Sequence, residues 1–150
     1  MKKFRFSLET VLDYKQQALD AIRAEHGAIL ARVRAQEEVV DGLEGEHRQV
    51  DGEFSQRKLE GLTILDALNY EQYLRALERE IQAARQKLEH LRQQEEKKRA
   101  QVVEARKETA TIEKLKEHKL EDYRKAAQKA EELQIEEFVS TTRAMAGVGI

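Results

Sequence analysis

Histidines and paired carboxylates are the side chains of this sequence that could do chemistry. A histidine beside a carboxylate can titrate near neutral pH, and two histidines one helical turn apart can bind a metal ion. His26 and His47 are 21 residues apart, or about 31 Å along one helix, and the motif H-E-x-x-H does not occur. We therefore predict no metal site.

Enzyme motifs are also missing from the sequence. It contains neither a glycine-rich phosphate-binding loop nor a G-x-S-x-G nucleophile motif. Acidic pairs such as Glu95-Glu96 are common in a chain with 29 acidic residues and do not mark a catalytic site. We predict that the chain is not an enzyme, has no catalytic residues and binds no cofactor.

Charge and composition narrow the classes of partner and compartment. Lysines and arginines alternate with glutamates, as on a solvated helix face, so the near-neutral chain (net charge -2) is not expected to bind nucleic acid. The absence of cysteine fits a reducing cytoplasm. The basic N-terminus lacks the apolar segment of a secretory signal, and no apolar run approaches the roughly 18 residues of a membrane span.

The elements that would position these side chains are long helices. Ala, Glu, Lys, Arg and Leu make up 84 of 150 residues, and proline is absent, which is typical of coiled coils. Apolar residues recur every 3.5 residues along two segments, as in a left-handed coiled-coil seam. The first seam comprises Leu8, Leu12, Lys15, Leu19, Ile22, His26, Ile29, Val33, Gln36, Val40, Leu43, His47, Val50 and Phe54. The second comprises Ala67, Tyr70, Leu74, Leu77, Ile81, Ala84, Leu88, Leu91, Glu95, Lys98, Val102, Ala105, Thr109 and Ile112.

A break between the two seams predicts an α-helical hairpin. Gly61 can end the first helix in a left-handed conformation, and Thr63 can cap the second, with Asp66 in its first turn. We expect a single all-α coiled-coil domain over residues 1–150, an antiparallel two-helix coiled coil. Its segments are helix 1 at about 5–58, a turn at about 59–63, helix 2 at about 64–140 and a frayed tail at 141–150.

This hairpin would bring polar seam residues together. If paired positions sum to about 121, His26 lies opposite Glu95, with Lys98 one layer further along. A polar layer of this kind can fix register and antiparallel orientation. A pH-sensitive latch is the alternative interpretation, and we prefer the register-setting layer.

The second helix is longer and should overhang the first at its C-terminus by about 20 residues, or ~30 Å. This overhang carries Tyr123, Leu133, Ile135 and Phe138. An unpaired helix with an apolar stripe is suited to a partner. It could also form homo-oligomer contacts between copies of the chain.

Three stretches resemble the FliJ family of bacterial flagellar export proteins. They are F-R-F-S-L-E-T-V-L (Phe4–Leu12), N-Y-E-Q-Y-L-R-A-L-E-R-E-I (Asn69–Ile81) and K-A-E-E-L-Q-I-E-E-F-V (Lys129–Val139). The resemblance implies a non-enzymatic component of the flagellar type III protein export apparatus, similar to the central stalk of rotary ATPases. Flagellum biogenesis, and with it motility and chemotaxis, would depend on such a protein.

The resemblance also implies partners and contact residues. The partners are the export ATPase FliI, whose ring assembly the protein would promote, the export gate protein FlhA, and export chaperones. The gate contact maps to a stripe beside the seam formed by Tyr73, Leu77, Glu80 and Ala84. Glu80 and Ala84 depart from the family's pattern at those positions. The ring contact maps to a tip formed by Phe4, Phe6, Leu8, Tyr123, Leu133 and Phe138.

The implied location is the cytoplasm, at the inner face of the cell membrane when the protein is docked, with peripheral association and no direct membrane insertion. Two other interpretations remain open from the residues alone. One is the equivalent stalk of a virulence type III secretion system or a rotary ATPase. The other is a generic coiled-coil spacer, for which the overhang should have no specific binding role.

Overall fold

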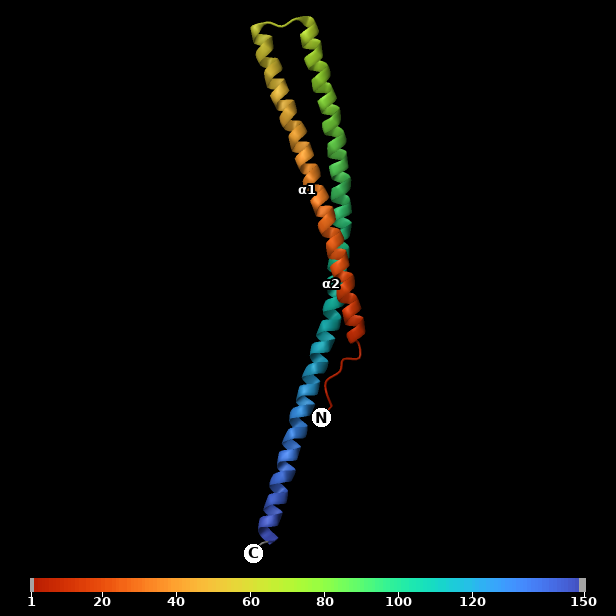
Figure 1. Cartoon of the computed structure of the whole chain (residues 1–150), viewed down its shortest axis with the longest axis vertical. Helices are drawn as coiled ribbons and strands as arrows, with labels where there is room; N and C mark the ends of the chain where they lie inside the picture. The colour runs from red at the N-terminus through yellow and green to blue at the C-terminus, as the bar shows by residue number, and fades with distance from the viewer. Residues whose placement is uncertain (1, 149–150) are drawn as a thin grey trace. The chain divides into compact units, whose positions relative to one another are not determined.

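The computed structural model describes residues 2–148 and consists of two long helices. Helix α1 spans Glu9–Glu60 and helix α2 spans Ile64–Val148. They form an antiparallel helical hairpin, with α2 the longer helix (Figure 1). The predicted fold class is confirmed. Within residues 2–148, neither helix has a stretch long and apolar enough to cross a membrane.

A short turn at residues 61–63 reverses the chain. Gly61 has φ = 102°, a left-handed conformation that glycine adopts without the steric penalty of a Cβ atom. The backbone N–H of Asp66 donates a hydrogen bond to Thr63 Oγ1 at 3.2 Å, so Thr63 caps α2. The sequence predicted both the left-handed Gly61 and the Thr63 cap, and the structure confirms them.

Helix α1 begins at Glu9 rather than near residue 5. Residues 2–6 have no regular secondary structure, and contacts with α2 hold them there. The Tyr123 hydroxyl donates a hydrogen bond to the Lys2 carbonyl at 2.5 Å, and the Phe4 and Tyr123 ring centroids are 5.6 Å apart. These contacts fix this N-terminal segment outside the helix.

The expectation of a frayed tail from residue 141 is wrong for the residues that the structure describes. Helix α2 continues without a break to Val148. Threonine is a poor helix former, but the Thr142 hydroxyl donates a hydrogen bond to the Phe138 carbonyl at 2.8 Å. This bond satisfies the hydroxyl inside the helix. Residues 149 and 150 of the expected tail lie outside the described residues.

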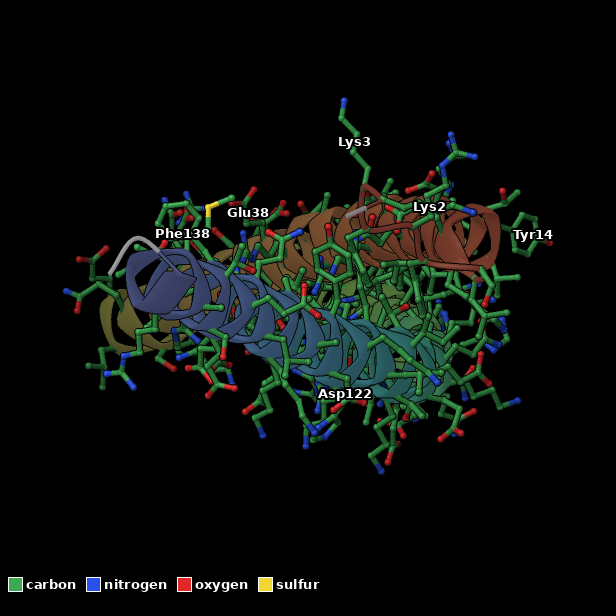
Figure 2. The ribbon with its side chains drawn as sticks, turned by 90° about the horizontal axis from the view of Figure 1, so that it is seen from below. Lys2, Lys3, Tyr14, Glu38, Asp122 and Phe138 are labelled. Carbon is green, nitrogen blue, oxygen red and sulfur yellow. The ribbon has the colours of Figure 1, made fainter. Side chains whose placement is uncertain are left out.

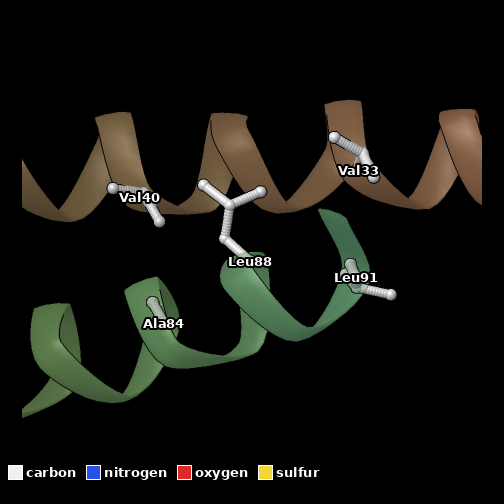
Figure 3. Packing of buried hydrophobic residues seen from close by; sticks show 5 residues of the cluster. All are labelled: Val33, Val40, Ala84, Leu88 and Leu91. Carbon is white, nitrogen blue, oxygen red and sulfur yellow. The ribbon is translucent and has the colours of Figure 1, made fainter. Parts of the chain in front are cut away.

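The hairpin comprises two compact units, and the single domain expected from the sequence stays a prediction. One unit spans Asp20–Val103. Its core is a cluster of Val33 and Val40 from α1 with Ala84, Leu88 and Leu91 from α2 (Figure 3). Residues of both predicted seams therefore interdigitate as the 3.5-residue period requires.

The other unit combines the residues up to Leu19 with those from Glu104 onward. Leu12, Leu19 and Thr109 are buried in it. Polar pairs also join its two helices. Lys15 Nζ lies 3.0 Å from Glu108 Oε2, and Lys116 Nζ lies 2.8 Å from Glu9 Oε2.

The two predicted seams match the burial of side chains along both helices. Each of the fourteen positions of the first seam, from Leu8 to Phe54, is buried or half-buried. The same holds for the fourteen positions of α2 from Ala67 to Ile112. The periodicity of the sequence thus identified the faces that the helices turn toward each other.

Candidate functional site

The four residues predicted to contact a gate protein separate into two groups. Tyr73 is 45% exposed and Glu80 is exposed, whereas Leu77 is only 3% exposed. Ala84 belongs to the buried core cluster, and its carbonyl accepts a hydrogen bond from Gln36 Nε2 at 3.0 Å. The expectation that all four lie beside the seam is therefore wrong for Leu77 and Ala84, which lie inside it.

Tyr73 is held in place by a residue of the opposite helix. Its hydroxyl donates a hydrogen bond to the Glu46 carboxylate. This bond, together with partial burial and the nearby negative charges of Glu46 and Glu80, raises the pKa of the Tyr73 phenol. The phenol stays protonated at neutral pH, so it presents an uncharged ring edge and a hydroxyl to any partner.

A shallow groove of about 380 Å³ adjoins Tyr73 on the side of the turn, and Glu53, Arg57, Asn69 and Tyr70 contribute to its lining. The Tyr70 ring stacks on Phe54 with centroids 5.0 Å apart, and the Arg57 guanidinium lies 5.9 Å from the Tyr70 centroid. This stacking gives the groove an ordered aromatic wall.

Sequence reasoning missed an exposed apolar surface around the turn. Leu59, Ile64, Leu65 and Leu68 are all exposed, and with Tyr73 we call them the turn surface. Leu68 is four positions from Ile64 and three from Leu65, so it neighbours both on the surface of α2, and neighbouring exposed apolar side chains are typical of protein interaction sites. The signal was present in the sequence L-E-G-L-T-I-L-D-A-L (residues 59–68), where most of the aliphatic residues lie outside the two seams.

The residues predicted for a ring-contact tip also separate. Phe4, Phe6, Leu8 and Tyr123 are half-buried, and Phe4 packs on Tyr123. Leu133 and Phe138 are 52% and 72% exposed, and Figure 2 shows Phe138 projecting from the C-terminal end of α2. The first group joins the N-terminal segment to α2, while the second lies beyond that junction.

Beyond Tyr123, α2 continues as an exposed helix. Every side chain from residue 128 to residue 147 is exposed, and we call residues 128–148 the arm. It includes Leu133, Ile135, Phe138, Val139 and Met145. A single helix with this many uncovered apolar side chains is suited to binding a partner surface.

Two polar residues of the seam, His26 and Glu95, bond to each other, whereas Lys98 pairs with an exposed residue outside the seam. His26 Nε2 lies 2.9 Å from Glu95 Oε1, and Arg99 donates to both oxygens of the same carboxylate, at 2.7 and 2.8 Å. Lys98 Nζ lies 2.8 Å from Glu25 Oε2. Hydrogen bonds from His26 and then from Arg99 hold the pKa of the Glu95 carboxyl below its usual value.

These features define a class of protein by its fold: an antiparallel coiled-coil hairpin with exposed apolar side chains near its turn and an exposed helical arm. The chain matches the family model described as flagellar FliJ protein over residues 4–145 and therefore belongs to that family. The family consists of non-catalytic components of flagellar export, and the predicted family membership is confirmed. No match was found among curated proteins or among solved structures.

Proposed function

We propose that this protein is a stalk-like component of flagellar protein export that catalyses no reaction itself. It promotes assembly of the export ATPase ring through its arm and couples that ring to the export gate through its turn surface. The observation that carries the proposal is the arm: α2 exposes every described side chain from residue 128 onward, including Ile135 and Phe138. Family membership supplies the export context.

The arm supports a ring contact because none of its described side chains is buried within its own unit. Binding a partner would cover exposed apolar side chains, each of which favours the complex through area removed from water. A protein that binds the assembled ring better than free subunits shifts the assembly equilibrium toward the ring by mass action. No chemistry by the stalk itself is needed.

The ring contact is tested with the purified export ATPase. Full-length protein should raise the hexamer fraction and the ATP turnover, whereas a variant lacking residues 128–150 should raise neither. The thermal unfolding midpoint of the variant should stay close to that of the full chain, because the removed side chains are exposed. Equal stimulation by both proteins would refute a ring contact through the arm.

The gate contact is tested at Tyr73, the exposed member of the predicted set. Tyr73→Ala should weaken binding to the cytoplasmic part of the gate protein at least several-fold and reduce motility. Tyr14→Ala is the matched control, since Tyr14 is an exposed tyrosine of α1 in the other unit. Leu77→Ala is unsuitable, because truncating a buried leucine costs about 2–5 kcal/mol of stability. Unchanged gate binding by Tyr73→Ala would contradict this site.

A further inference from the structure

The Tyr73 side chain belongs to α2 but is bonded to α1. Its hydroxyl donates a hydrogen bond to the Glu46 carboxylate. Neither residue belongs to a seam, and both are exposed. The bond therefore joins the two helices on the outside of the hairpin, where a partner can reach it.

The same arrangement recurs one heptad along α1. Glu53, seven positions after Glu46, accepts a hydrogen bond from the Tyr70 hydroxyl at 3.0 Å, and residues seven positions apart lie on the same side of a coiled-coil helix. Tyr70 has further restraints, because its ring stacks on Phe54 and Arg57 donates to its hydroxyl at 3.2 Å. The position of Tyr70 therefore does not depend on its carboxylate alone.

Tyr73 has fewer restraints than Tyr70. Within residues 2–148 it takes part in no aromatic stacking, and the bond to Glu46 is its one side-chain hydrogen bond. A mobile side chain loses its freedom when a partner fixes it, which weakens binding by about two- to tenfold, and a side chain that is already held loses less. Glu46 therefore prepares Tyr73 for binding.

We infer that Glu46 is a positioning residue of the gate contact, because it holds the Tyr73 ring in the orientation that the gate protein binds. This inference rests on the proposed function, in which Tyr73 contacts the gate protein. It makes the gate contact a property of both helices, although all the residues predicted for that contact belong to α2. The contact then depends on the pairing of the helices at this position.

The test measures the affinity of full-length variants for the purified cytoplasmic part of the gate protein. Glu46→Ala should weaken binding about fivefold. Glu46→Gln should weaken it less than about twofold, because the amide oxygen can still accept the hydrogen bond. Glu38→Ala is the matched control, since Glu38 is another exposed glutamate of α1 in the same unit. The unfolding midpoint should hardly change in any variant. A lower midpoint with unchanged affinity would reduce Glu46 to a structural role and overturn the inference.

Two further measurements test whether Glu46 acts through Tyr73. In a Tyr73→Phe background, which lacks the hydroxyl, Glu46→Ala should weaken binding by less than about 1.5-fold. In protein with ¹³C-labelled tyrosine, the Tyr73 signal is the one lost in Tyr73→Phe. Its titration should show a lower phenol pKa in Glu46→Ala, because the substitution removes both the acceptor and the negative charge that raise this pKa. An unchanged pKa would show that the bond does not form and would overturn the inference.

The outcomes separate this inference from the proposed function. Wild-type protein that does not bind the gate protein, or Tyr73→Ala that binds as tightly as wild type, contradicts the proposed gate contact and this inference with it. Binding that depends on Tyr73 but is unaffected by Glu46→Ala overturns the inference alone. A loss on Glu46→Ala that is just as large in the Tyr73→Phe background also overturns it, since Glu46 would then contact the gate protein directly.

Discussion

The Glu95 carboxylate lies in the seam and has two hydrogen-bonding neighbours, one on each helix. It accepts hydrogen bonds from Arg99 on its own helix and lies 2.9 Å from His26 of the facing helix. A carboxylate buried among apolar neighbours would lose its hydration without compensation, and these partners provide that compensation. The pair also ties one position of α1 to one position of α2, which supports the interpretation of a register-setting layer.

The lowered pKa of Glu95 predicts a pH dependence of stability. Because its pKa in the folded state lies below that in the unfolded state, Glu95 stabilises the fold above the unfolded-state value of about 4.3. This contribution disappears as pH falls through the folded-state pKa. Glu95→Gln should therefore lower the free energy of unfolding at pH 7, and its difference from wild type should narrow below about pH 4.3.

Urea unfolding of both proteins at pH 7 and at pH 3.5 measures this difference. Glu96→Gln is the control, because Glu96 is the exposed neighbour of Glu95 in α2. A destabilisation by Glu95→Gln that is the same at both pH values would contradict the electrostatic origin assigned to it.

Helix α1 contains glycines at positions where its backbone conformation does not require glycine. The turn contains a glycine whose backbone conformation does require it. A Cβ atom added at Gly27, Gly42 or Gly52 would meet no heavy atom within 4 Å. The helix therefore loses backbone stability at these positions without gaining a closer approach within the chain. Gly61 differs, because its left-handed backbone conformation forms the turn.

These two kinds of glycine predict opposite effects of the same substitution. Gly42→Ala should raise the free energy of unfolding by about 0.5–1 kcal/mol, since alanine is the better helix former. Gly61→Ala should lower it by about 1–2 kcal/mol, because a Cβ atom is strained at positive φ. Urea unfolding midpoints of the two variants measure this, and a stabilising Gly61→Ala would contradict the role assigned to the turn.

The sequence predicted the hairpin well because a 3.5-residue period leaves few alternatives for long segments without proline. It placed His26 opposite Glu95 and Thr63 at the start of α2, both of which depend on spacing alone. The periodicity placed Leu77 and Ala84 in the seam, where they lie, whereas the family resemblance placed them beside it, because a resemblance indicates positions along a helix and not which face they occupy. The sequence also ended α2 too early, because the low helix propensity of residues 140–142 is a weak signal that does not by itself end a helix.

Other features depended on contacts that a linear pattern does not contain. Residues 2–6 stay outside α1 because the Tyr123 side chain binds them across 121 positions of sequence. The turn surface could have been read from the aliphatic residues between 59 and 68, but periodicity directs attention to the seams.

The hairpin topology also implies an order in which the chain folds. Contacts beside the turn join residues that are close in sequence, such as Arg57 and Tyr70, 13 positions apart, whereas the contact between Lys2 and Tyr123 closes a loop of 121 positions. Loop closure costs more entropy as the loop grows, so pairing should start at the turn and proceed toward the termini. During synthesis on the ribosome, the apolar seam of α1 therefore stays exposed to solvent until α2 emerges. The N-terminal segment is the last part of the hairpin to pack.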